Sequence, residues 1–218
     1  MSKRTELLAA LGRAVPEPAG HPVRVAIDGM TGVGKTTLRA ELAAALRDAG
    51  REVVEGSGDD FHHQREHRYR QGRRSARGYY EDAYDYHALA AKLLTPLGPG
   101  GDRRVRLRHH DLETDAILGD EPTVALTPGT TLVVDGSFLM RPEVADLWDF
   151  VVLVEATREV SVARQAARDG SSEDPSDPYY DRYLDGYDLY VAQCNPHSRA
   201  HVIVDNSDLE HPVLRFTS

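Results

Sequence analysis

The sequence predicts an α/β fold, a doubly wound parallel sheet with helices on both faces. Two features of the 218-residue chain indicate this: short apolar runs rich in β-branched residues recur along it, and segments with helical spacing of leucine alternate with them. The length suits one domain with a full core. Strands that alternate with helices pair in parallel, and the helices then cover both faces of the sheet.

The chain is expected to consist of a short N-terminal segment and one main domain. Residues 1–15 have the pattern of an amphipathic helix. Its apolar side carries Leu7, Leu8 and Leu11. Residues 15–22 are rich in proline and glycine, which is typical of a linker. We therefore assign residues 1–22 to an N-terminal helix and linker, and residues 23–218 to the main domain.

Strands and helices alternate along the main domain. The expected strands cover residues 23–27, 52–55, 131–135, 150–154 and 201–204. The expected helices are the segment with Leu38, Leu42 and Leu46, which Gly50 ends, and residues 85–94, 158–169 and 180–190. Residues 59–86 are polar and rich in arginine, histidine and tyrosine, and residues 96–102 and 170–178 are expected to be turns or loops.

Three polar clusters directly follow expected strands. They are residues 29–37, 59–63 and 135–138. In parallel α/β sheets, ligands bind beyond the carboxyl ends of the strands. The sequence therefore predicts one binding site built from these three distant segments.

The first cluster carries a phosphate-binding motif. Residues 29–36 satisfy G-x-x-x-x-G-K-[ST], with a strand expected before the motif and a helix after it. Glycines let the backbone wrap around phosphate with its N–H groups inward, and the helix N-terminus favours negative charge. We expect nucleotide contacts from Gly29, Thr31, Gly32, Val33, Gly34, Lys35, Thr36 and Thr37. A glycine-rich turn that matches by chance is the structural alternative. The fold class is thus narrowed to a P-loop NTPase fold.

The motif leaves the reaction open, because kinases, GTPases and ATPases all use it. The sequence contains no N-K-x-D motif for reading guanine. A kinase and a nucleotide-hydrolysing switch or binding module both remain. A kinase needs an acceptor site, whereas a switch does not.

Composition limits the partners and the compartment. The formal net charge of −9 argues against general nucleic-acid binding, although the arginine run from Arg65 to Arg77 keeps nucleic acid or a substrate phosphate as alternatives to a solvated face. The single cysteine, Cys194, cannot form a disulfide within the chain, so a cytoplasmic location is expected. We find no apolar run long enough to span a membrane, and we expect no membrane partner.

Several further segments resemble the uridine kinase family, which is related to phosphoribulokinase and bacterial pantothenate kinase. Asp59-Asp60-Phe61 resembles the D-x-F element of that family, residues 80–85 resemble its H-P-D-A-F-D stretch, and residues 131–136 resemble its apolar strand ending in E-G. Residues 164–169 and 205–208 resemble its arginine-bearing lid helix and its last polar turn. The resemblance covers residues 23–208, with Asp135 in place of the usual Glu.

This resemblance implies a mechanism. It implies that Asp59 is the catalytic base, that Lys35 holds the triphosphate, and that Arg164 and Arg168 belong to a mobile lid over about residues 164–190. Mg²⁺ would be held by Thr36 and Asp135. The structural alternatives are a helix cap or turn for Asp59 and a strand-end turn for Asp135. Asp60 is expected to be a solvated neighbour.

The expected acceptor contacts come from the second cluster and from segments after it. They are Asp59, Phe61, Tyr80, Asp82 and His110. Carboxylates suit sugar hydroxyls and rings suit stacking, but core packing is an equal alternative for the tyrosines, and His110 is more often a structural type of residue. A zinc site at His62, His63 and His67 is weakly supported, since no cysteine or fourth ligand has the required spacing.

We therefore expect an ATP- and Mg²⁺-dependent phosphotransferase that acts on a small hydroxyl compound. The leading acceptor is the 5′-hydroxyl of uridine or cytidine. The alternatives are another small alcohol, such as a pantothenate-like, sugar-phosphate or secondary-metabolite acceptor. Family relatives form oligomers, so a homo-oligomer is also expected, although no segment marks its interface.

Overall fold

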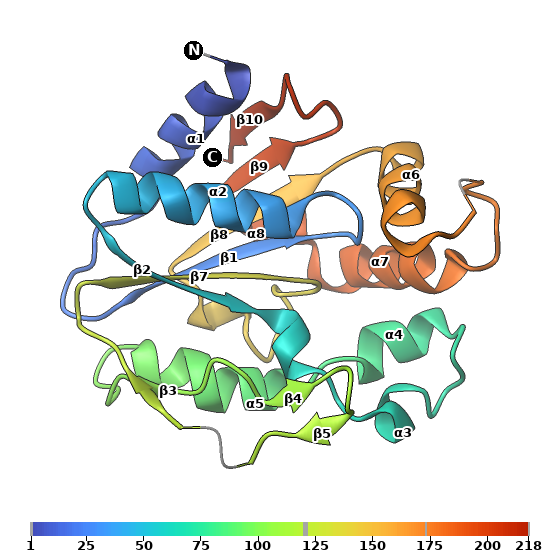
Figure 1. Cartoon of the computed structure of the whole chain (residues 1–218), viewed down its shortest axis with the longest axis horizontal. Helices are drawn as coiled ribbons and strands as arrows, with labels where there is room; N and C mark the ends of the chain where they lie inside the picture. The colour runs from blue at the N-terminus through green and yellow to red at the C-terminus, as the bar shows by residue number, and fades with distance from the viewer. Residues whose placement is uncertain (1, 120–121, 173, 218) are drawn as a thin grey trace.

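The computed structural model of the chain describes residues 2–119, 122–172 and 174–217. Its centre is a six-stranded sheet with the order β10-β9-β8-β1-β7-β2 (Figure 1). Five strands are parallel, and β10 pairs antiparallel to β9 at one edge. The strands are β1 (Val23–Gly29), β2 (Glu52–Ser57), β7 (Thr130–Gly136), β8 (Phe150–Glu155), β9 (Val202–Asp205) and β10 (Val213–Phe216). The predicted α/β fold is confirmed.

Helices cover both faces of this sheet (Figure 1). The longer ones are α1 (Lys3–Ala14), α2 (Lys35–Asp48), α4 (Ala76–Asp82), α6 (Arg158–Asp169) and α7 (Asp181–Cys194). The shorter ones are η1 (Gly58–Phe61), α3 (Arg65–Arg68), α5 (Tyr86–Leu89), η2 (Ala90–Leu94), η3 (Thr95–Leu97), η4 (Ala145–Leu147) and α8 (Pro196–Arg199). The other strands form two small antiparallel pairs, β3 (Arg104–Val105) with β6 (Val124–Ala125) and, between them in the chain, β4 (His110–Asp111) with β5 (Ala116–Ile117).

The sheet is buried on both faces because each central strand contributes side chains to two hydrophobic cores, one on each face. Along β1, Val25 and Ile27 point into one core, and Ala26 between them points into the other. Side chains of a strand alternate between its faces, so a continuous apolar run supplies both cores. The first core contains leucines of α1 and α2, and the second contains α5, η2 and the aromatic side chains of α4 and α7.

The strand register brings the predicted polar clusters together. β1 lies between β7 and β8, with Ile27 beside Asp135 and Asp28 beside Leu153. On the other side of β7, Ser57 at the end of β2 pairs with Asp135. The carboxyl ends of β1, β2 and β7 therefore meet at one edge, as the sequence predicts.

The structure departs from the expected elements between residues 58 and 125. The segment 59–86 contains η1, α3 and α4, which its polar composition hides. The expected helix 85–94 continues from α5 into a π-helical turn, η2. The strand pairs β3–β6 and β4–β5 were not predicted, nor was β10 near the end of the chain. Such short elements depend on tertiary contacts, because an isolated turn of helix is marginal in water.

The N-terminal helix is part of the main fold. Leu7 and Leu11 are buried in the core that α2 covers, together with Val15. Arg4 donates to Asn206 Oδ1 over 2.6 Å and pairs with Glu41 of α2. Some residues of the two expected segments lie outside the described residues. They are residue 1 of the N-terminal segment and residues 120, 121 and 218 of the main domain, together with residue 173 of the expected lid.

Candidate active site

The phosphate-binding motif forms a tight loop between β1 and α2. Gly34 caps α2 with a φ of 96°, and Gly32 has a φ of 78°, a region that side chains disfavour. A Cβ on Gly32 would lie 2.3 Å from the carbonyl oxygen of Ser161, and one on Gly34 would lie 2.6 Å from Asn206 Nδ2. Glycine is therefore required at both positions by conformation and by space.

Two residues from distant elements hold this loop. Ser161 of α6 donates its hydroxyl to the carbonyl oxygen of Thr31 over 2.5 Å, and Asn206 after β9 donates to the carbonyl oxygen of Val33 over 2.8 Å. Asn206 lies in the polar turn noted in the sequence, whereas Ser161 gave no signal there. The loop is thus positioned by both the helix and the strand that follow β8.

Lys35 lies at the start of α2, with its ammonium 2.8 Å from the carbonyl oxygen of Met30. Burial lowers the pKa of Lys35, while the carboxylates of Asp59, Asp28 and Asp135 act in the opposite direction. Three acidic groups therefore favour the charged ammonium inside the loop.

Oxygen ligands suited to Mg²⁺ lie next to this lysine. Thr36 donates its hydroxyl to Asp135 Oδ2 over 2.5 Å, and Arg39 donates to Asp135 Oδ1 over 2.6 Å. A hydroxyl and a carboxylate are hard oxygen donors of the kind that Mg²⁺ prefers, so the residues present fit this ion.

A cavity of about 600 Å³ opens in front of the loop. It brings together most of the residues predicted for catalysis and nucleotide binding. Its wall includes Thr31, Gly32, Gly34, Lys35, Thr36, Thr37, Asp59, Asp135, Arg164 and Arg168. Gly29 and Val33, also predicted, do not line it; Val33 is buried beneath the loop and Gly29 ends β1.

Asp59, not Asp60, faces this cavity. Asp59 lies in η1, and Tyr84 donates a hydrogen bond of 3.3 Å to its Oδ1. Asp60 instead pairs with Arg108 at 3.1 Å. Ser57, the last residue of β2, caps η1 because its hydroxyl accepts from the Asp59 amide, so the end of β2 fixes the backbone of Asp59.

The two lid arginines lie on α6 and have partners in this structure. Arg164 donates to the carbonyl oxygens of Asn206 and Ser207 over 2.9 and 3.0 Å. Arg168 pairs with Asp169 at 2.7 Å. α6 itself covers Arg158–Asp169 as predicted, from the capping hydroxyl of Thr157 to Gly170.

Four residues that the sequence predicted to contact the acceptor do not line the cavity, so the structure does not bear out direct contact from them. Phe61 is buried in the core, and Tyr80 packs against Phe138 with its hydroxyl 3.4 Å from Cys194 Sγ. Asp82 is buried and bound by Arg70 and Gln71. His110 is buried with its Nε2 3.1 Å from Asp115. Neighbouring residues line the cavity instead: Tyr79, Ala83 and Tyr84 are part of its wall, whereas Tyr80 and Asp82 are not.

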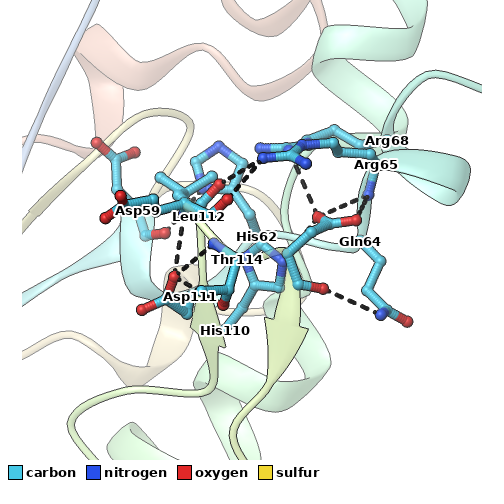
Figure 2. A network of polar contacts seen from close by, with 11 residues as sticks. Asp59, His62, Gln64, Arg65, Arg68, His110, Asp111, Leu112 and Thr114 are labelled. Carbon is cyan, nitrogen blue, oxygen red and sulfur yellow. Dashed lines mark hydrogen bonds and ion pairs between the residues drawn. The ribbon is translucent and has the colours of Figure 1, made fainter.

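Sequence reasoning also missed residues of the wall. Besides Tyr79, one of the tyrosines considered as acceptor contacts, they include His62, Arg68, Tyr69, Ala83, Tyr84, Leu112, Gly136, Ser137, Arg182 and Tyr183. Figure 2 shows Arg65 and Arg68 extending side by side to the turn between β4 and β5, with His62 between them and Asp59 in this view. The arginine-rich composition of this segment was the available signal, but it could not tell a cavity arginine from a solvated one.

Among the described residues, no three His, Cys, Asp or Glu side chains gather as a metal-binding group, so the weak zinc hypothesis gains no support. Nor does any helix of the described chain have the length and apolarity needed to cross a membrane.

The model of the phosphoribulokinase/uridine kinase family matches residues 24–209. The chain belongs to the phosphoribulokinase/uridine kinase family. It is therefore a kinase, an ATP-dependent phosphotransferase that acts on a small molecule, and this family membership favours an acceptor over a nucleotide-driven switch.

Solved structures agree with this membership of the phosphoribulokinase/uridine kinase family. A structure from Bacillus stearothermophilus, described as a possible uridine kinase, is 26% identical with a TM-score of 0.71 and covers 92% of this chain and 96% of its own. A structure from Silicibacter sp. TM1040, provisionally described as a fructose transport system kinase, is 23% identical with a TM-score of 0.67 and covers 88% and 95%. The second likeness concerns the fold alone. No curated protein sequence matches the chain.

Proposed function

We propose that this kinase transfers the γ-phosphoryl group of Mg·ATP to a hydroxyl of a small acceptor, with Asp59 as the base. The observation that carries this proposal is the single cavity wall that holds Asp59 together with Lys35, Thr36 and Asp135. A base for the acceptor and a cradle for phosphate thus share one space, which is what direct transfer requires.

The proposed step balances as follows. The acceptor oxygen forms a bond to the γ-phosphorus, the bond from that phosphorus to the bridging oxygen breaks, and ADP leaves with the electron pair. The hydroxyl proton passes to the Asp59 carboxylate, whose position is supported by the Tyr84 hydroxyl.

The remaining wall residues bind and orient the nucleotide. Lys35 and the loop amides bind the phosphates, and Thr36 and Asp135 would hold Mg²⁺, which when bound neutralises charge on phosphate oxygens. Arg164 and Arg168 are proposed to contribute positive charge near the migrating group from α6.

Asp59→Asn tests the role of the base. We expect kcat to fall by about 10²–10⁴ while the Kd for Mg·ATP stays nearly unchanged, because the amide cannot accept the proton. The assay is ADP release with an acceptor panel, with nucleotide binding measured by calorimetry. Asp60→Asn is the matched control, since Asp60 pairs with Arg108 outside the cavity wall, and we expect it to retain most activity. Equal loss of turnover and nucleotide binding in Asp59→Asn would remove Asp59 from this role.

Within the class of small alcohols, the 5′-hydroxyl of uridine or cytidine is one candidate, to be assayed beside anionic alcohols. Its support is the 26% identical structure described as a possible uridine kinase, together with the tyrosine rings at positions 69, 79, 84 and 183 on the cavity wall. Such rings can stack against a base. ADP release stimulated by uridine or cytidine above other alcohols would support this acceptor, and equal release without any acceptor would count against it.

A further inference from the structure

One arginine of the cavity wall is buried without a hydrogen-bond acceptor. Arg68 is 7% exposed, and its Nε finds no partner. Among the described residues, its guanidinium donates no hydrogen bond to the protein, and its one ion pair is a long contact of 3.7 Å from Nη2 to Asp115 Oδ1. A buried guanidinium with unmet donors is costly to maintain, so a structure that keeps one at a cavity wall is suited to an anion.

Asp115 meets this charge only in part, because its oxygens are already engaged. Its two oxygens each accept from the backbone amide of Arg65 over 3.0 Å, and Oδ1 also lies 3.1 Å from His110 Nε2. Figure 2 shows the Arg68 side chain lying alongside that of Arg65. Asp115 thus fixes the β4–β5 turn against α3 more than it neutralises Arg68.

A second buried arginine contacts the same tyrosine ring. Within the part of the chain that the structure describes, Arg182 at the start of α7 donates only to the carbonyl oxygens of Arg73 and Ser75, at 3.0 and 3.4 Å. The guanidinium carbons of Arg68 and Arg182 lie 5.1 and 5.2 Å from the centre of the Tyr69 ring. Arg73 also lies 5.0 Å from the centre of this ring, but only Arg68, Arg182 and Tyr69 line the cavity, so cation–π contacts with one ring orient both cavity arginines.

The cavity wall has a surplus of positive side chains on the side of Arg68 and Arg182. Among the residues that the structure describes, the wall contains five cations, Lys35, Arg68, Arg164, Arg168 and Arg182, and two carboxylates, Asp59 and Asp135. Lys35 and the α6 arginines belong with the triphosphate, and Asp135 also pairs with Arg39. Arg68 and Arg182 then face an acceptor region with one carboxylate, although the chain as a whole carries −9.

We propose that the acceptor of this kinase carries an anionic group, a carboxylate or a phosphate ester, that Arg68 and Arg182 bind while its hydroxyl faces Asp59. This inference rests on the proposed function, since it assigns the acceptor region of the same cavity. Guanidinium groups bind either anion through paired N–H donors. Uridine and cytidine lack such a group, so the charge of the wall favours hydroxy acids or sugar phosphates.

The test measures anion binding with the nucleotide site filled. The full chain is saturated with Mg·AMP-PNP, and inorganic phosphate is titrated by calorimetry, with acetate in a parallel arm to distinguish phosphate from carboxylate recognition. We expect the wild-type protein to bind at least one of these anions. Arg68→Gln should weaken that binding by about 10- to 100-fold, the usual effect of losing hydrogen bonds to a charged group.

Controls separate this inference from the proposed function. Arg74→Gln removes an exposed arginine from the same segment outside the cavity and should leave anion binding unchanged. Retained Mg·AMP-PNP affinity shows that Arg68→Gln is folded, and Arg182→Gln provides a second variant with the same expected loss. The inference would be overturned if the wild-type complex bound neither anion, or if both cavity variants bound anions as tightly as the wild-type protein. The proposed kinase function would be unaffected by either result. Failure of Mg·AMP-PNP to bind would instead count against the proposed function.

A kinetic arm uses acceptors that differ only in charge. Pantothenate is compared with pantetheine, and glycerate with glycerol, by ADP release, with uridine beside them. We expect any stimulating pair to favour its anionic member, with a kcat/KM preference that Arg68→Gln reduces. A preference for the neutral member, or uridine as the best acceptor, would refute the proposal.

Discussion

At the scale of single residues, the partners of an arginine separate structural roles from functional ones. Arg24 donates to both oxygens of Asp149 and so closes the amino end of β1. Arg39 fixes Asp135. Arg68 has the same chemistry and comparable burial, yet none of the described carboxylates lies within hydrogen-bond distance of it. An arginine-rich sequence therefore contains several kinds of site, and only the position of the carboxylates distinguishes them.

A histidine outside the cavity leads to a prediction about pH. His109 Nδ1 accepts from the ammonium of Lys92 over 2.5 Å, so protonation of that nitrogen would break the bond and oppose two cations. Burial, followed by the nearby Lys92, lowers the pKa of His109 below its ordinary value of 6.5. The unfolded chain then binds this proton at higher pH than the folded chain does. We expect the free energy of unfolding to fall as the pH drops from 6.5 through the lower pKa of the folded protein.

Denaturant titrations at pH 7.5, 6.5 and 5.5 measure this effect. His109→Gln should flatten the decrease over that range, because glutamine keeps an acceptor for Lys92 but does not titrate. Part of the slope should remain, since burial also lowers the pKa of His62 and His63. An unchanged slope in the variant would show that His109 does not cause it.

At the scale of elements, the active site depends on contacts between helices that the sequence does not connect. α7 packs against α4 and is tied to the end of β1, because the Tyr190 hydroxyl donates to buried Asp28. The same packing places Tyr79 of α4 and Tyr183 of α7 on the cavity wall, with their ring centres 5.1 Å apart. The acceptor region is thus shaped by the α4–α7 contact as much as by the loop itself.

Two glycines in helices test that contact. A Cβ on Gly186 of α7 would lie 2.9 Å from Tyr79 Cδ1 and 3.2 Å from the carbonyl oxygen of Ala76, whereas one on Gly12 of α1 would meet nothing closer than 3.9 Å. Both alanine variants gain about 1 kcal/mol of helix propensity. Gly186→Ala alone pays for overpacking, so we expect it to be less stable than Gly12→Ala by about 1–3 kcal/mol. Chemical denaturation measures the difference, and equal gains would mean that α4 and α7 are not closely packed.

At the scale of the whole molecule, the N-terminal helix and the sheet share one core. Leu11 is fully buried with Leu42 and Leu46 of α2, and Arg4 reaches Asn206, which holds the phosphate-binding loop. The sequence suggests a division at residue 22, where a linker ends. In the folded protein, however, the segments on both sides of this residue share one packed core.

Leu11→Ala tests whether the N-terminal segment is integral to the domain. Removal of a fully buried leucine side chain should lower the free energy of unfolding by about 2–5 kcal/mol in one cooperative transition. Leu8→Ala, the same change at a half-buried position of the same helix, should cost less. A separate early transition for the helix, with the main transition unchanged, would instead support two independent parts.

The sequence by itself determined the parallel sheet, the phosphate-binding loop and the edge at which the site lies. Those features depend on local patterns: apolar strand runs, helical periodicity, and the glycines and lysine of one motif. Asp59 could be placed on the cavity side for the same reason, since it directly follows β2.

Only the tertiary structure decided which residues of the segment from 59 to 115 face the cavity. Tyr79 lines it while Tyr80 and Asp82 are turned inward, because the rotation of α4 is set by its packing against α7. Arg68 and Arg182 are far apart in the chain, yet both contact the ring of Tyr69. Neighbouring residues of one composition differ in role because burial and partners arise from contacts between distant segments, which local sequence does not encode.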